Sequence, residues 1–278
     1  MIDPLHERDA ESIGEPIQKR KRLRRVPFRL LLPNLVTLLA LCVGLTGVRM
    51  AIEGRLEMAV YLVVLAAALD GVDGRLARLL KGASRFGAEL DSLTDFVNFG
   101  VAPALILYMW GLNGLGHVGW IGALILAIAC ALRLARFNVA LDDPNKPAWS
   151  SAFFTGVPAP AGAIGALLPI YLEFLGFPRT PIGTPLVLAY VIGVALLMVS
   201  PLPTWSGKQL GARVSRAYVA PALIGAALFV ALLVSYPWFV LTAVVLVYLG
   251  LMPLAFMHHR RLTARDAAAQ AQTSEPAS

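Results

Sequence analysis

The stretch DGVDGRLARLLKGASRFGAELDSLTD, residues 70–95, lies between two long apolar segments and contains four aspartates. Asp70 and Asp73 are three residues apart, and Asp91 and Asp95 are four apart, so on helices each pair shares a face. Two such faces opposed across a short turn would bring the four carboxylates around one point. Oxygen ligands suit Mg²⁺ or Mn²⁺, and Mg²⁺ is usually held by a few carboxylates together with substrate phosphates.

Small residues beside the first aspartate pair leave room for a ligand. At about 100° per residue, Gly74 and Ala77 fall close to the Asp70 face and Arg78 lies at its edge. A single aspartate at a helix end is most simply a solvated cap. Ionisable groups at the edge of apolar segments are costly and by default mark a functional site. The set therefore predicts a site for divalent cations and a phosphate.

The composition indicates an integral membrane protein rather than two soluble domains. The chain has 278 residues, of which 58% are hydrophobic and 15% charged. Its net charge of +7 favours basic loops facing anionic lipid, and we expect no nucleic-acid partner. Cys42 and Cys130 lie in apolar segments and have no CxxC partner, so we expect them to be packing residues.

The chain divides into a basic N-terminal segment (1–32), a transmembrane domain (33–257) and a tail expected to be disordered (258–278). Recurrent apolar segments of about 20 residues, each long enough to cross a bilayer, predict an all-α integral membrane protein, a polytopic bundle of about eight transmembrane helices. They lie near residues 33–52, 57–77, 90–110, 118–138, 157–175, 184–201, 217–235 and 237–257.

Lys and Arg predict the orientation of this bundle, because they accumulate on the cytoplasmic side. With both termini cytoplasmic, the segments on that side hold 21 of the 24 basic residues. Arg49, Arg55 and Arg179 fall on the other side. The aspartate stretch, between the second and third predicted spans, then lies at the cytoplasmic face.

The aspartate stretch also resembles a known family. The pattern D-x-x-D-G-x-x-A-R followed by G-x-x-x-D-x-x-x-D is similar to the signature of the CDP-alcohol phosphotransferases. All eight fixed positions match: Asp70, Asp73, Gly74, Ala77, Arg78, Gly87, Asp91 and Asp95.

The resemblance implies a reaction and roles for these residues. CDP-diacylglycerol would give its phosphatidyl group to the hydroxyl of an alcohol and release CMP. Asp70, Asp73, Asp91 and Asp95 would hold two Mg²⁺ or Mn²⁺ ions, and Asp95 would also take the hydroxyl proton. The residues implied to bind CDP-diacylglycerol are Asn34, Thr37, Asp70, Asp73, Gly74, Ala77, Arg78 and Gly87.

Other segments resemble the bacterial branch of the family that uses L-serine and forms phosphatidylserine. They are PNLVT (33–37), LRLARFNV (132–139), FFTGVPAPA (153–161) and SPLPTWSGK (200–208). Arg133 and Arg136, three residues apart on one helical face, either extend to the membrane interface or bind the serine carboxylate or a phosphate. The resemblance implies the cell (inner) membrane as location, with membrane lipid around the chain, and we expect a homodimer.

Alternatives remain within the family and outside it. The acceptor could be glycerol 3-phosphate or an inositol phosphate. Intramembrane carboxylates also serve ion-coupled transporters, which place them near the bilayer midplane, often in paired repeats with broken helices. Prenyltransferases of the membrane use two Asp-rich motifs on distant helices. The clustering of the aspartates in one window at one face argues against both of these classes.

Cysteine labelling tests the orientation. In a chain without Cys42 and Cys130, a cysteine replacing Gly82 should react with an impermeant thiol reagent from the cytoplasmic side, and one replacing Gly54 from the outer side. The measurement compares inside-out with right-side-out vesicles, and the opposite pattern would overturn the orientation.

Overall fold

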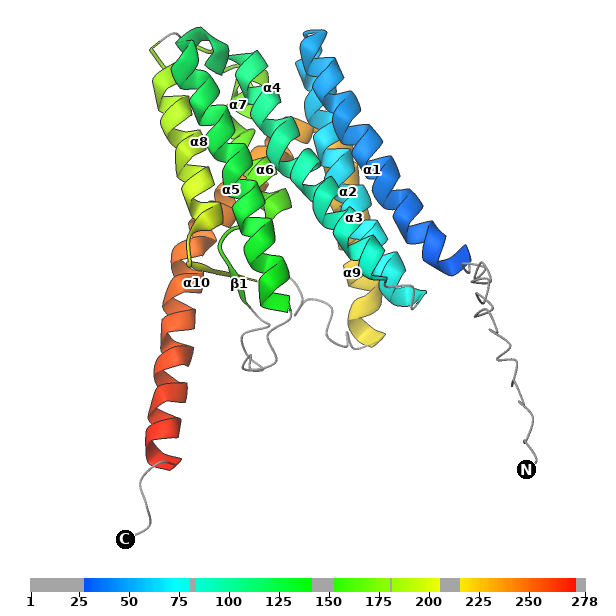
Figure 1. Cartoon of the computed structure of the whole chain (residues 1–278), viewed down its shortest axis with the longest axis vertical. Coiled ribbons are helices and arrows are strands. Elements are labelled where there is room, and N and C mark those ends of the chain that lie inside the picture. The colour runs from blue at the N-terminus through cyan, green and yellow to red at the C-terminus, as the bar shows by residue number, and fades with distance from the viewer. Residues whose placement is uncertain (1–27, 81–83, 142–152, 181, 206–215, 274–278) are drawn as a thin grey trace, which may run out of the picture.

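The computed structural model describes residues 28–80, 84–141, 153–180, 182–205 and 216–273 (Figure 1). Most of the basic segment 1–32, Gly82 and residues 206–208 of the SPLPTWSGK segment lie outside these ranges. The helices are α1 (Phe28–Ile52), α2 (Leu56–Leu79), α3 (Arg85–Asp95), the π-helical η1 (Phe96–Val101), α4 (Ala102–Trp110), the 3₁₀ turn η2 (Leu112–Leu115), α5 (His117–Leu141), α6 (Ala159–Ala166), α7 (Leu168–Phe174), α8 (Thr184–Val199), α9 (Arg216–Ser235) and α10 (Pro237–Thr273).

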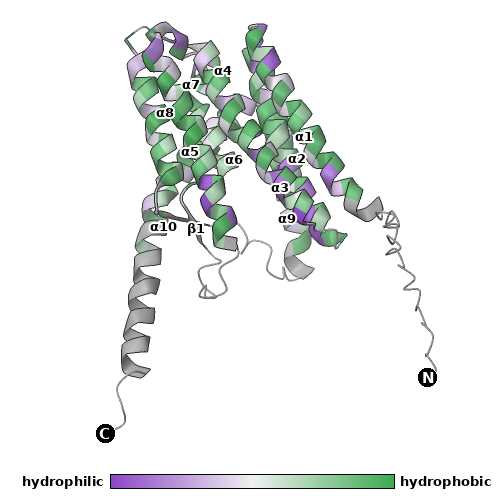
Figure 2. Ribbon diagram, in the orientation of Figure 1, coloured by the Kyte–Doolittle hydropathy of each residue, from purple (hydrophilic) through white to green (hydrophobic). Residues whose placement is uncertain are grey.

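The helical membrane class is confirmed, and the hydropathy of the helices is shown in Figure 2. Of the described helices, four are long and apolar enough to cross a membrane: Leu31–Ile52, Arg85–Trp110, His117–Ala140 and Pro237–Leu254. Thr184–Val199 and Val219–Ser235 are shorter apolar helices. The number of eight spans stays a prediction.

Several boundaries differ from the expected ones. α1 begins at Phe28, so Pro33 lies inside the helix and not in its first turn. The span expected at 90–110 begins at Arg85 and changes to a π-helix after Asp95. α10 was expected to end near residue 257, with a disordered tail from 258, but it continues to Thr273.

The segment expected as one span at 157–175 is two helices, α6 and α7, which meet at Leu167. Pro169 explains the break, because it has no N–H to donate to the carbonyl of Gly165. The hydroxyl of Tyr190 donates to this carbonyl at 2.7 Å. Such replacement bonds are what makes a broken helix acceptable in a membrane.

A small ribbon, outside the all-α expectation, joins the start of α6 to the end of α8. β1 (Phe153–Thr155) pairs antiparallel with β2 (Pro203–Trp205), with Phe153 opposite Trp205. Gly156 follows with a φ of 76°, and a Cβ there would lie 2.4 Å from the carbonyl oxygen of Met198. Only glycine fits this left-handed position against a neighbouring backbone.

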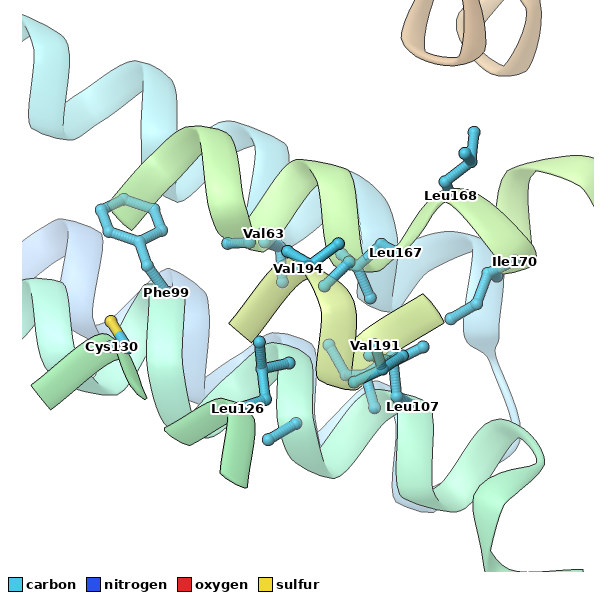
Figure 3. Packing of buried hydrophobic residues seen from close by; sticks show 14 of the residues in the cluster. Val63, Phe99, Leu107, Leu126, Cys130, Leu167, Leu168, Ile170, Val191 and Val194 are labelled. Carbon is cyan, nitrogen blue, oxygen red and sulfur yellow. The ribbon is translucent and has the colours of Figure 1, made fainter. Parts of the chain in front are cut away.

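The core lies where η1, α4, α5 and α8 meet (Figure 3). Phe99, Leu107, Leu126 and Val191 are completely buried there. A Cβ at Gly100 would lie 3.0 Å from the Cβ of Cys130, so η1 and α5 approach closely. Cys130 is thus a buried packing residue, as expected, whereas Cys42 is exposed.

The chain direction brings the functional residues to one end of the molecule. α1 and α2 are antiparallel neighbours, α3 returns beside them, and α5 runs back toward the end at which α2 stops and α3 starts (Figure 1). The side chains of Ser92 and Asn138 are hydrogen-bonded at 3.0 Å and tie α3 to the last turns of α5. The aspartates on α2 and α3 and the arginines on α5 therefore lie at the same end.

Candidate active site

Three of the four aspartates converge. Asp70 near the end of α2 and Asp91 and Asp95 on α3 each place one carboxylate oxygen within 4.8 Å of the others. All three side chains are half-buried. Carboxylates this close repel one another when they are partly withdrawn from water, so the cluster requires cations or protons to neutralise it. An all-oxygen, all-carboxylate donor set fits Mg²⁺ or Mn²⁺.

Asp73 is not a member of this group of three, although its spacing from Asp70 predicted four carboxylates around one point. It is 3% exposed, and the hydroxyl of Thr37 on α1 lies 2.7 Å from its Oδ2. The same hydroxyl lies 3.1 Å from the carbonyl oxygen of Pro33, one turn earlier. Thr37 therefore connects α1 to α2 at the aspartate and does more than bond to its own helix.

A pocket of about 180 Å³ lies between α1, α2 and α3. Four residues with little or no side chain, two from each of α2 and α3, create its space: Gly74, Ala77, Gly87 and Ala88. Its polar groups come from Asn34, Thr37, Asp73, Ser84 and Asp91.

Asn34 lies directly against α3. A Cβ at Gly87 would lie 2.7 Å from Oδ1 of Asn34, whereas a Cβ at Gly74 would meet no atom within 4 Å. Gly87 therefore lets α1 approach α3, and Gly74 opens the pocket. Ser84 caps α3 by accepting a hydrogen bond of 3.0 Å from the Gly87 N–H.

Asp91 belongs to both parts of the site. It lines the pocket together with Asp73, and it is a member of the group formed with Asp70 and Asp95. A phosphate-bearing ligand in the pocket would consequently reach cations held by the three carboxylates. This shared residue makes the pocket and the cation cluster one site.

Not every residue expected at the pocket lines it. Asp70 and Arg78 are not among its lining residues, and Arg78 is exposed, with its Nε donating to the carbonyl of Gly74 at 3.0 Å. Conversely, Ser84, Pro33 and Ala88 line the pocket and were not assigned to it from the sequence. Ser84 could have been found as a residue that begins a helix after a break in the apolar pattern.

The structure separates the two arginines that share a helical face on α5. Arg133 is buried, its Cζ lies 5.6 Å from the ring centroid of Phe137, and Asp95 is one of its electrostatic neighbours. Arg136 is exposed, and its Nη1 donates to the carbonyl of Val199 at 2.6 Å. Arg133 is thus buried within electrostatic range of Asp95, whereas Arg136 ties α5 to the end of α8.

The chain belongs to the CDP-alcohol phosphatidyltransferase family. The model of that family matches residues 30–202, which include the pocket, the carboxylate cluster and both arginines. A second model, CDP-alcohol phosphatidyltransferase 2, matches residues 217–253 in α9 and α10.

Individual proteins that are similar to this chain carry more specific names than the family. The chain is 40% identical to a Mycobacterium leprae protein named CDP-diacylglycerol–serine O-phosphatidyltransferase, over 90% of this chain and 82% of the relative. A Helicobacter pylori protein of the same name is 37% identical over 61% of this chain and 70% of the relative. An archaetidylserine synthase of Methanothermobacter thermautotrophicus is 29% identical, over 64% of this chain and 70% of the relative.

The two pocket glycines should respond differently to alanine. Gly74→Ala adds a methyl group to open pocket space, so the thermal midpoint should stay within about 2 °C of wild type while the KM for a CDP-lipid rises. Gly87→Ala forces Asn34 away, so the midpoint should fall by about 4 °C or more. Thermal unfolding and steady-state kinetics measure both effects. Equal destabilisation by the two variants would contradict the geometry of the pocket.

Proposed function

We propose that the protein transfers the phosphatidyl group of CDP-diacylglycerol to the hydroxyl of L-serine, giving phosphatidylserine and CMP. The single observation that carries the proposal is Asp91, which connects a pocket between α1, α2 and α3 to a cluster of three carboxylates. The relatives named for this reaction, at up to 40% identity over most of the chain, support the choice of donor and acceptor.

The pocket is the proposed place of the CDP part of the donor. Gly74 and Ala77 allow the nucleotide to lie against α2, and Asn34 and Thr37 offer hydrogen-bonding groups from α1. Phosphate oxygens extending past Asp91 then reach the carboxylate cluster. Arg78, exposed at the rim, is the proposed partner of a phosphate or of an acid.

Asp70, Asp73, Asp91 and Asp95 are the proposed ligands of two Mg²⁺ or Mn²⁺ ions. The fit rests on the convergence of three carboxylates and on Oδ1 of Asp95, which is buried without a hydrogen bond in the described part of the chain. Bound cations would neutralise charge on the diphosphate and on the departing CMP. The protein contributes the fixed positions of the donor and of the acceptor hydroxyl.

Asp95 is the proposed general base. The serine oxygen attacks the phosphorus of the phosphatidyl group, its proton passes to the Asp95 carboxylate, and the bond from phosphorus to the CMP oxygen breaks. Of the histidines in described helices, His117 lies at the start of α5, at the opposite end from the site, and His258 and His259 lie on α10 beyond its apolar part, Pro237–Leu254 (Figure 1). The acid–base role consequently falls to a carboxylate.

Arg133 is the proposed partner of the serine carboxylate. It is buried, Asp95 is one of its electrostatic neighbours, and its Nε has no hydrogen-bond partner among the described residues. A single buried guanidinium suits one carboxylate better than an additional phosphate dianion. Serine is therefore favoured over glycerol 3-phosphate and inositol phosphate. Arg136, held by Val199, is the weaker candidate for this role.

The proposal includes the setting of the enzyme. It is a multi-pass protein of the cell (inner) membrane with about eight spans, with the site and both termini on the cytoplasmic side, and it forms a homodimer. Asp70 and Asp73 lie in the second half of α2, and Asp91 and Asp95 lie in the first half of the Arg85–Trp110 span, so all four are displaced toward one end of the bundle. This placement favours an interfacial enzyme over an ion-coupled transporter.

Release of CMP tests the acceptor. Purified protein with CDP-diacylglycerol and Mg²⁺ or Mn²⁺ should release CMP with L-serine and little with glycerol 3-phosphate or inositol phosphate. Asp95→Asn should bind the donor without turnover. Release that depends on glycerol 3-phosphate and not on serine would keep the family and refute the proposed acceptor.

The arginines supply a matched pair for the same assay. Arg133→Gln should raise the KM for serine by roughly tenfold to a hundredfold, as expected for a lost hydrogen bond to a charged group. Arg136→Gln removes a contact with α8, so its effect on this KM should be smaller, and the thermal midpoint should fall. The reverse order of the two effects on KM would contradict the placement of serine at Arg133.

A further inference from the structure

Two polar side chains lie buried below the carboxylate cluster without partners. Thr94, in α3, is 3% exposed, and Asn98, in η1, is completely buried. Neither Oγ1 of Thr94 nor Oδ1 or Nδ2 of Asn98 has a hydrogen-bond partner in the described part of the chain. Each buried polar atom left unpaired costs about 1–3 kcal/mol, so these positions call for a ligand.

These side chains lie on the face of α3 and η1 that meets α1. A Cβ at Gly44 of α1 would lie 2.0 Å from Oδ1 of Asn98, so the Asn98 amide points directly at α1. Gly87, which faces Asn34 of α1, is seven residues before Thr94, and Thr94 is four residues before Asn98. These spacings place all three on one side of the helix. Arg133, in contrast, belongs to α5 and not to α1.

Asp95 joins the same group. It follows Thr94 and precedes Asn98 by three residues, a spacing at which helical side chains are neighbours. Its Oδ1 is buried and has no hydrogen bond with any described residue. Thr94, Asp95 and Asn98 thus bring four buried polar atoms without described hydrogen-bond partners to one short stretch of α3 and η1, although the pocket described above does not include Thr94 or Asn98 in its lining.

We infer that Thr94 and Asn98 hold internal water, one or two molecules, against the carboxylate of Asp95. Buried water takes about two to four hydrogen bonds from otherwise unpaired polar groups, and this set of four atoms provides them. A larger ligand is disfavoured because both side chains are almost completely buried. Within the bilayer, water reaches such groups only where the protein holds it.

The consequence concerns the orientation of Asp95, and it rests on the proposed function of that residue. An ionised carboxylate has about four lone-pair positions, so an oxygen bound to a cation retains capacity for a hydrogen bond from water. Water fixed by Thr94 and Asn98 sets the rotation of the carboxylate, and with it the direction from which the acceptor hydroxyl is deprotonated. Thr94 and Asn98 are positioning residues, since they act through Asp95.

Removal of one hydroxyl tests this inference. Thr94→Val keeps the shape of the side chain and deletes the water ligand, so kcat should fall roughly tenfold to a hundredfold, the range for residues that orient metal ligands. The KM for CDP-diacylglycerol should stay within about twofold, because the pocket is not touched. Thr94→Ser retains the hydroxyl and should restore most of kcat. A uniform loss in both Thr94 variants would indicate a packing role and refute the inference.

Thr242 supplies the matched control. It lies on α10, it is also buried, its hydroxyl has no hydrogen-bond partner among the described residues, and it is not part of the site. Thr242→Val should leave kcat unchanged, so an equal loss in Thr242→Val and Thr94→Val would refute the inference. If Thr94→Val fails to fold, Asn98→Leu removes two of the four polar atoms and should give the same loss in kcat.

A direct observation of water completes the test. An experimental structure that shows ordered water should contain density bonded to Thr94 and Asn98 in the wild type, and this density should be absent in Thr94→Val. Wild-type protein with no water there would overturn the inference whatever the kinetics. If the wild type transfers the phosphatidyl group to an alcohol other than serine, the proposed acceptor is refuted. The kcat of Thr94→Val measured with that alcohol would still test whether Thr94 holds water against Asp95.

Discussion

The central constraint of the site is the mutual repulsion of three carboxylates, those of Asp70, Asp91 and Asp95. Helix packing keeps one oxygen of each within 4.8 Å of the others. The protein retains this unfavourable arrangement because α1, α2 and α3 are in close contact on either side of it. Gly87 allows α3 to meet Asn34, and Thr37 lies 2.7 Å from Asp73. Cations bound at the proposed metal site would neutralise the carboxylates and relieve this repulsion.

The rest of the structure supports this cluster from the side of α5. Gly100 and Cys130 bring η1 onto α5, and the pair Ser92–Asn138 fixes α3 along it. This packing places Arg133 near Asp95 within the protein interior. The pocket, the carboxylates and the buried guanidinium thus lie at the same end of the bundle. In the proposed reaction, this arrangement would place the nucleotide and the attacking alcohol near the same carboxylates.

The cluster was predictable from the sequence because it depends on local spacing: Asp91 and Asp95 share a face, and a turn returns them to Asp70. Features that depend on distant partners were not. Arg136 has the same spacing signals as Arg133, but it donates to a backbone carbonyl of α8 that no pattern reveals. The π-helical turn after Asp95 carries no distinct composition and accompanies the close approach to Cys130. The break before Pro169 was predictable from its missing N–H, but the sequence analysis treated residues 157–175 as one span.

Binding of Mn²⁺, measured by electron paramagnetic resonance on the purified protein with CDP present, tests the central claim most directly. The account predicts about two ions per wild-type chain, as in two-metal phosphoryl-transfer sites. Asp91→Ala should abolish Mn²⁺ binding because Asp91 belongs to both the pocket and the carboxylate cluster. The control is Glu57→Ala, which removes an exposed carboxylate at the start of α2 and should leave Mn²⁺ binding unchanged. Wild-type stoichiometry and affinity in Asp91→Ala would contradict the account.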